Sequence, residues 1–85
     1  MQTKEIVLTN QGGLHARPAT FFVQECNKYK STVTVTCNGK SGNAKSVITL
    51  MSLGAGEGKT ITLTIEGEDE VVAMENLIQY LEQLT

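Results

Sequence analysis

Two short segments of this 85-residue chain alternate strictly between polar and apolar residues, Thr32–Cys37 (TVTVTC) and Thr60–Ile65 (TITLTI). Such alternation is typical of a strand that buries one face and exposes the other. The inward residues are predicted to be Val33, Val35, Cys37, Ile61, Leu63 and Ile65. The chain must therefore build a sheet with one apolar face, and other elements must cover that face.

Two further strands are predicted beside these segments. Lys4–Thr9 is rich in strand-forming residues, with Ile6 and Leu8 on one face, and Asn10–Gly13 ends it as a turn. Asn38-Gly39 is a strong hairpin-turn dipeptide, so a short return strand is expected from about Lys40.

Three helices are predicted from a change of period. From Ala16 the apolar residues fall at i, i+3, i+4 and i+7 (Ala19, Phe22, Val23, Cys26), and this helix is expected to fade near residues 27–30. Ser46 is expected to cap a short helix that runs to about Ser52 and stops at the loop Leu53–Gly58. Asp69 is expected to cap the last helix, whose apolar stripe is Ala73, Leu77, Leu81 and Leu84.

The resulting order is β-α-β-β-α-β-α. Each strand has one apolar face and each helix has one apolar stripe, so the economical arrangement is α+β. We expect an open-faced sandwich: one antiparallel sheet with the helices packed on one side. The chain length predicts a single domain over residues 1–85.

Composition excludes several classes of function. Cys26 and Cys37 lie 11 residues apart and match no metal-ligand or redox spacing, and one histidine completes no metal site. We therefore expect reduced, buried thiols, no metal and no cofactor. The chain has no apolar run long enough to span a bilayer and no secretory pattern, so a cytoplasmic location without membrane insertion is expected.

The charge is unevenly distributed. The net charge of −2 argues against nucleic-acid binding. Residues 1–45 nevertheless carry a net +4, and residues 46–85 a net −6. The histidine lies in the basic half, which favours an anionic substrate or an acidic partner there. A chance asymmetry on a small surface is the alternative.

The segment Gly12–Thr20 (GGLHARPAT) carries the chemistry. Pro18 is tolerated only in the first turn of a helix, so His15 stands at a helix start, where histidine is a poor cap. Free amides and the positive end of the helix dipole favour an anion there, and the guanidinium of Arg17 suits phosphate. The same dipole disfavours the imidazolium, which keeps His15 neutral and nucleophilic. The alternative is that His15 is a solvated loop residue with no function.

Ser46 and the helix after it form a second feature. Val47, Ile48, Leu50, Met51 and Leu53 cannot all be buried in one narrow helical stripe, so an exposed apolar patch for a partner is predicted. A phosphoryl group on Ser46 would repel an acidic partner docking there. Simple N-capping by Ser46 is the alternative.

Together, GGLHARPAT, NGKSGNAKS and MSLGAGEG resemble the family of histidine-containing phosphocarrier proteins (HPr) of the bacterial phosphoenolpyruvate-dependent sugar phosphotransferase system. The resemblance covers essentially the whole chain. It implies strand order 1-4-2-3 with three helices on one face. It also implies a phosphoryl carrier with a covalent phosphohistidine, rather than a stand-alone enzyme.

In this family, enzyme I phosphorylates Nδ1 of the residue matching His15, and IIA domains of sugar permeases receive the group. The resemblance assigns charge balance to Arg17 and a docking face to Ala16, Thr20, Val47, Ile48, Met51 and Ser52. It also implies regulation at Ser46 by an HPr kinase/phosphorylase, with a catabolite-control transcription factor as partner, and a monomer. Many relatives carry glycine where this chain has Thr49.

Three alternatives stay open. The chain acts as a regulatory module through Ser46 and its apolar patch, or it belongs to a nitrogen-regulatory branch of the same system. A small-ligand or RNA-binding α+β domain is disfavoured by the acidic charge and by the scarcity of aromatic residues. Paralogues that lost the histidine are excluded by His15.

Overall fold

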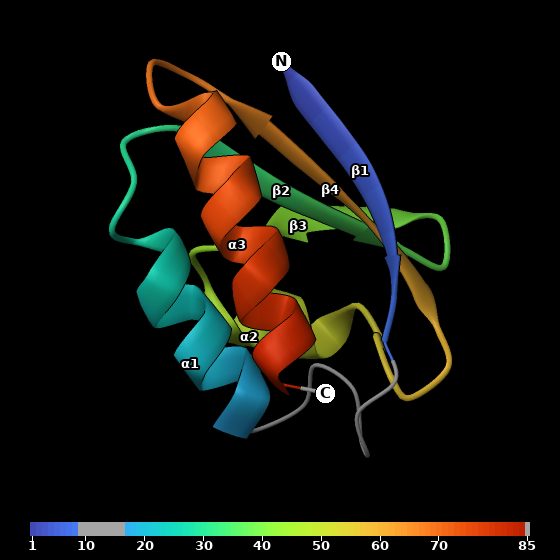
Figure 1. Ribbon diagram of the computed structural model, residues 1–85. Helices are drawn as coiled ribbons and strands as arrows, with labels where there is room; N and C mark the ends of the chain where they lie inside the picture. The colour runs from blue at the N-terminus through green and yellow to red at the C-terminus, as the bar shows by residue number, and fades with distance from the viewer. Residues whose placement is uncertain (9–16, 85) are drawn as a thin grey trace.

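The computed structural model describes residues 1–8 and 17–84, with the backbone alone for Arg17 and Leu84. The predicted order β-α-β-β-α-β-α is confirmed (Figure 1). The elements are β1 (Gln2–Val7), α1 (Arg17–Cys26), β2 (Thr32–Cys37), β3 (Lys40–Asn43), α2 (Val47–Ser52), β4 (Thr60–Glu66) and α3 (Glu70–Leu84).

Within the described residues the strands form one antiparallel sheet in the order β1-β4-β2-β3, as the resemblance implied. Ile6 lies opposite Ile61 between β1 and β4, and Val35 lies opposite Leu63 between β2 and β4. The first strand starts earlier than predicted, because Gln2 already pairs with Ile65, and it ends at Val7. Thr9, the predicted end, lies outside the described residues.

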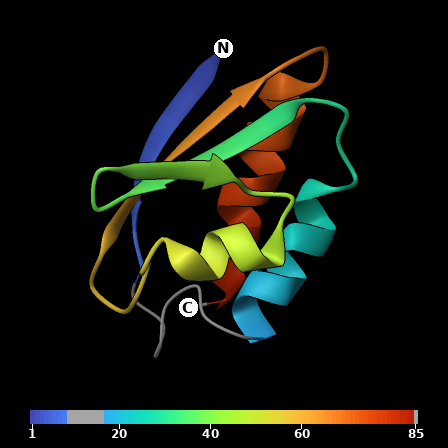
Figure 2. The ribbon, with the colours of Figure 1, turned by 180° about the vertical axis from the view of Figure 1, so that it is seen from behind.

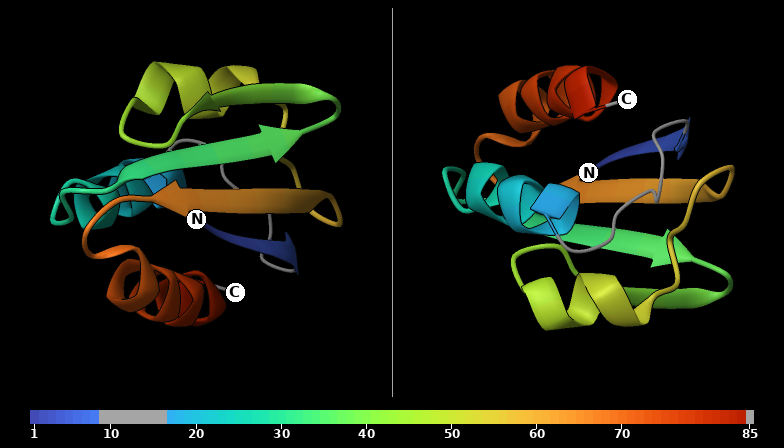
Figure 3. Two further views of the ribbon diagram at one scale, coloured as in Figure 1. Left: turned by 90° about the horizontal axis from the view of Figure 1, so that it is seen from above. Right: turned by 90° about the horizontal axis from the view of Figure 1, so that it is seen from below.

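The helices cover one face of this sheet. Helices α1 and α3 lie in front of the strands in Figure 1 and behind them in Figure 2, and Figure 3 shows the layers from both ends. The short helix α2 packs against β3 and α1. The other face of β2 and β4 is lined by half-buried threonines, namely Thr34, Thr36, Thr62 and Thr64. The expected open-faced sandwich is therefore confirmed.

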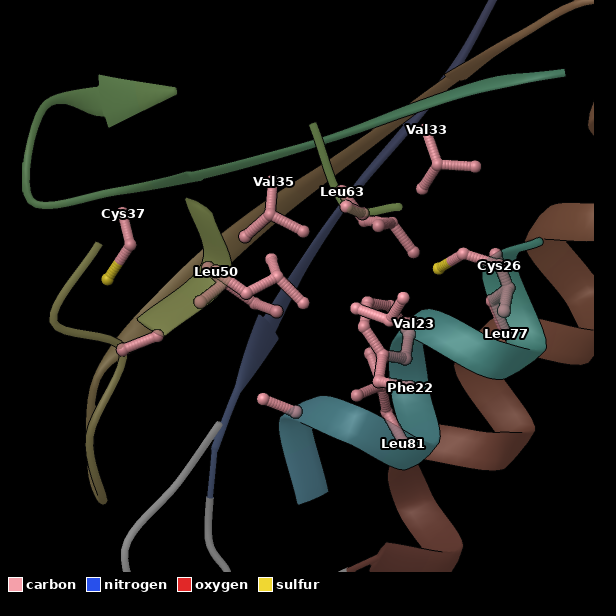
Figure 4. Packing of buried hydrophobic residues seen from close by; sticks show 14 of the residues in the cluster. Phe22, Val23, Cys26, Val33, Val35, Cys37, Leu50, Leu63, Leu77 and Leu81 are labelled. Atoms are coloured by element: carbon pink, nitrogen blue, oxygen red, sulfur yellow. The ribbon is translucent and has the colours of Figure 1, made fainter. Parts of the chain in front are cut away.

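The core lies between the sheet and the helices (Figure 4). The predicted inward residues of β2 and β4 are buried, as are Ala19, Phe22, Val23 and Cys26 of α1 and Ala73, Leu77 and Leu81 of α3. The side chain of Leu84 lies outside the described part. Cys26 and Cys37 are both buried and free. No helix in the described ranges is long and apolar enough to cross a bilayer.

The hairpin of β2 and β3 turns at Asn38 and Gly39, whose φ angles of 55° and 77° confirm the predicted Asn-Gly turn. The Asn38 side chain also reaches the end of α2, because its Nδ2 donates to the carbonyl oxygens of Leu53 at 3.2 Å and Gly54 at 3.3 Å. The turn thus supplies a donor to the carbonyl of Leu53, the C-cap of α2, which has no partner within the helix.

The last helix starts after Asp69 as predicted, and the Asp69 carbonyl accepts the Ala73 amide at 2.8 Å, but the Asp69 side chain has another role than the one expected. Asp69 precedes the helix, but its carboxylate accepts the amides of Lys30 and Ser31 in the loop between α1 and β2. The side chain that folds back on the start of α3 is Glu70, whose Oε1 accepts the amide of Gly67 at 3.2 Å. Asp69 therefore joins two segments that are distant in sequence.

Candidate functional site

Along the chain, the predicted site follows Leu8, which is anchored in the core, and runs into α1. Leu8 is buried; its amide donates to the Lys59 carbonyl at 2.9 Å, and its own carbonyl accepts the Gly58 amide at 2.7 Å. On the other side, α1 begins at Arg17. His15, with its neighbours Gly12, Gly13 and Ala16, lies outside the described residues.

The first turn of α1 confirms the interpretation of Pro18. Pro18 is the second residue of the helix, where a missing amide hydrogen costs no internal hydrogen bond. Ala19 is buried and Thr20 is exposed, so one side of this turn is anchored in the core and the other faces solvent. The positive end of the helix dipole lies at this turn, which makes the start of α1 electropositive. His15 precedes this helix by two positions.

Ser46 is the N-cap of α2, as predicted. Its backbone is extended, with φ −120° and ψ 118°, and its Oγ accepts the Thr49 amide at 3.4 Å. The preceding loop is held separately, because the Asn43 side chain accepts the Lys45 amide at 2.9 Å. Lys45 reaches across to the carbonyl of Tyr29 through its Nζ, at 2.7 Å. Ser46 thus lies at a corner between β3 and α2 that several hydrogen bonds hold in place.

The helix after Ser46 exposes the apolar patch that the sequence predicted. Ile48 is 82% exposed and Met51 38% exposed, while Leu50 is buried. Val47 is half-buried and Ser52 is exposed. The sequence did not single out Phe21, which is 42% exposed on α1 and lies outside the buried helical stripe.

The start of α1, helix α2 and the end of β1 lie at the same end of the molecule (Figures 1 and 2). The predicted docking residues that are described, Thr20 on α1 and the exposed residues of α2, are therefore on neighbouring elements, and α1 packs against α2. Such an arrangement places an electropositive helix start beside an exposed apolar surface.

Comparison with known proteins decides the family. A family model described as the PTS HPr component phosphorylation site matches residues 2–83. The chain belongs to the HPr family. It is 48% identical to the HPr-like protein Crh of Halalkalibacterium halodurans over 83 residues, which are 98% of this chain and 99% of that protein. It is 40% identical to the phosphocarrier protein HPr of Vibrio cholerae, with 99% of each chain covered.

Solved HPr structures agree with the fold. An HPr of Thermoanaerobacter tengcongensis superimposes with a TM-score of 0.95 at 40% identity, covering 99% of this chain and 94% of the other. The Crh protein of Bacillus subtilis, described as an intertwined dimer with a swapped domain, gives a TM-score of 0.77 at 41% identity, covering 100% and 98%. The recognition of the HPr family from GGLHARPAT and its companion motifs is thus confirmed.

Proposed function

We propose that this chain carries a phosphoryl group on Nδ1 of His15, receiving it from enzyme I, itself charged by phosphoenolpyruvate, and passing it to IIA domains of sugar permeases. One observation carries the proposal: the only histidine of an HPr-family chain stands two positions before the first residue of α1. An imidazole at an electropositive helix start is suited to hold an anionic phosphoryl group.

The chemistry at such a site is simple. The lone pair of Nδ1 attacks phosphorus, and the bond between phosphorus and the donor breaks. In the second transfer a nucleophile of the acceptor attacks the same phosphorus, the bond between Nδ1 and phosphorus breaks, and the imidazole recovers its lone pair. Phosphoryl transfer depends mainly on positioning and on stabilising charge on the equatorial oxygens, so most of the machinery lies on the partner. Arg17, the first residue of α1, is assigned to balance that charge.

Docking is assigned to the predicted patch of Ala16, Thr20, Val47, Ile48, Met51 and Ser52. The exposure of Ile48 and Met51 supports it, because large apolar side chains on a surface helix gain most from a partner. The net +4 of residues 1–45 adds attraction for acidic partners.

The test uses phosphoenolpyruvate, purified enzyme I and the whole chain. We expect an acid-labile, base-stable phosphate on the wild-type protein and on Ser46→Ala, and none on His15→Ala. Both variants must show the circular-dichroism spectrum of the wild type. Substantial phosphoryl flux through folded His15→Ala would overturn the proposal.

A second function is favoured by the similarity to a Crh protein and by the position of Ser46 at the start of an exposed helix. In this function, an ATP-dependent HPr kinase/phosphorylase modifies Ser46, and a catabolite-control transcription factor binds the modified form. Its mark is an acid-stable label from ATP that Ser46→Ala lacks. A nitrogen-regulatory role for the same His15 remains the alternative. The two roles are distinguished by which IIA-type acceptor takes the labelled phosphoryl group from the protein.

The monomer implied by the resemblance stays a prediction. Sedimentation at several protein concentrations tests it, with a concentration-independent mass of one chain expected. A stable mass of two chains would bring this protein closer to the Crh dimer of Bacillus subtilis.

A further inference from the structure

The hydroxyl of Ser46 has both of its acceptor positions occupied by one residue. The Thr49 amide donates to Ser46 Oγ at 3.4 Å, and the Thr49 hydroxyl donates to the same oxygen at 3.1 Å. Both hydrogen bonds hold Ser46 Oγ toward the first turn of α2, so the oxygen must leave them to meet an electrophile that a partner supplies. The shorter of the two contacts belongs to the Thr49 hydroxyl, not to the backbone cap.

The orientation of Thr49 is set by β3. Its Cγ2 methyl group occupies the space above Gly42, where an added Cβ would lie only 2.2 Å from it. Threonine carries its methyl and hydroxyl on one carbon, so a methyl group held against Gly42 leaves the hydroxyl a restricted direction. That direction points it at Ser46.

Ser46 is held on its other side as well. Its amide donates to the Asn43 carbonyl at 3.1 Å, and its carbonyl accepts the Leu50 amide at 3.1 Å. The backbone of Ser46 is therefore held in place, and its Oγ can leave the cap only by rotation of the side chain about χ1. That rotation breaks both hydrogen bonds from Thr49, and the shorter of them comes from the Thr49 hydroxyl.

We propose that Thr49 is a positioning residue that restrains Ser46 as a phosphoryl acceptor, by holding the Ser46 hydroxyl in the cap. The inference rests on the second proposed function, modification of Ser46 by an ATP-dependent kinase. In that step a base of the kinase removes the hydroxyl proton, Ser46 Oγ forms a bond to the γ-phosphorus of ATP, and the bond to the β-phosphate breaks, so that ADP leaves. To reach the γ-phosphorus, Oγ must leave the cap, and the hydrogen bond from the Thr49 hydroxyl resists that movement.

The experiment measures kcat and KM for labelling of Ser46 by a purified HPr kinase with radiolabelled ATP. Thr49→Val removes the hydroxyl and keeps the methyl group over Gly42, whereas Thr49→Ser keeps the hydroxyl. Thr36→Val is the matched control, because it removes the hydroxyl of another threonine–serine pair, Thr36 and Ser41, at 2.8 Å on the hairpin.

We expect Thr49→Val to raise kcat about three- to tenfold with little change in KM, the range for loss of one hydroxyl hydrogen bond. Thr49→Ser and Thr36→Val are expected to keep the wild-type kcat. A purely structural role for Thr49 would instead lower the melting temperature of Thr49→Val and leave its kcat unchanged or reduced.

The outcomes separate the two claims. An unchanged or lower kcat for Thr49→Val, with wild type labelled on Ser46, overturns the role of Thr49 and leaves the regulatory function standing. If neither wild type nor Thr49→Val takes label on Ser46, the regulatory function fails and the inference fails with it. Strong labelling of Thr49→Val beside weak labelling of wild type supports both.

Discussion

Asp69 and Ser31 are joined by two hydrogen bonds that tie the start of α3 to the loop before β2. The Ser31 amide donates to Asp69 Oδ1 at 3.0 Å, and the Ser31 hydroxyl donates to the same oxygen. Ser31 is 1% exposed, so these bonds satisfy polar groups that are removed from water. The Lys30 amide donates to the other carboxylate oxygen at 2.9 Å.

This clamp predicts a loss of stability in acid. The hydrogen bond from the Ser31 hydroxyl, and then the one from the Lys30 amide, lower the pKa of Asp69 below its ordinary value of 3.8. A depressed pKa contributes stability that is present above the unfolded-state pKa and is lost as the pH falls through the folded-state pKa. The melting temperature of wild type should therefore exceed that of Asp69→Asn at pH 7, and the gap should close below about pH 4. A gap that is constant from pH 7 to pH 3 contradicts the assignment.

Gly67 is predicted to tolerate no side chain. Its φ is 153°, and an added Cβ would lie 2.7 Å from the Ser31 Cα and 2.8 Å from its Cβ. Gly67→Ala should lower the free energy of unfolding by about 1–3 kcal/mol in urea titrations. Gly56→Ala is the control, since open space surrounds that position, and we expect a change within about 0.5 kcal/mol. Equal stabilities for the two variants would refute the steric argument.

Arg17 is predicted to act on transfer and not on folding. Arg17→Gln should slow phosphorylation by enzyme I about ten- to a hundredfold, the loss expected for charge-assisted hydrogen bonds to phosphate. The phosphorylation rate of Arg17→Lys should fall between those of wild type and Arg17→Gln, because lysine keeps the charge and loses the planar guanidinium. Lys30→Gln removes a cation beyond the other end of α1 and serves as the control in the same stopped-flow assay. Wild-type rates in Arg17→Gln would remove Arg17 from the site.

Ile48 is predicted to serve docking alone. At 82% exposure its replacement by serine should change the melting temperature little, yet it should raise the KM for enzyme I several-fold. Val71→Ser is the matched control, because Val71 is 54% exposed on the first turn of α3, at the opposite end of the molecule from α2 (Figure 1). If Val71→Ser raised the KM as much as Ile48→Ser, the docking surface would be misplaced.

Cys26 is predicted to be chemically inert in the folded protein. Burial raises the pKa of its thiol to about 12, so almost no reactive thiolate exists at pH 8. In a Cys37→Ala variant, where Cys26 is the remaining thiol, alkylation at pH 8 should proceed only as fast as the protein unfolds. Adding denaturant should make it immediate. Fast alkylation under native conditions would show that the thiol is accessible.

Local patterns determined most of the elements. Thr32–Cys37 was predicted with the bounds observed, and the helix after Ser46 ends at Ser52 as expected. Alternation and capping are properties of a few neighbouring residues, so they are readable without the fold. The motif around His15 likewise predicted the family and the first-turn position of Pro18, because proline has few other places in a helix.

Contacts between distant segments were decided by the tertiary structure. Asp69 was predicted to cap its own helix, but its carboxylate accepts the backbone amide of Lys30, 39 residues away. Its local position suited both roles, and only the fold brought the loop amides within reach. The position of the Thr49 methyl group above Gly42 depends in the same way on how α2 packs against β3. Sequence therefore determined which residues form most elements and where the proposed phosphoryl acceptor lies along the chain. Packing determined which polar groups meet, because those pairings follow from distances in space.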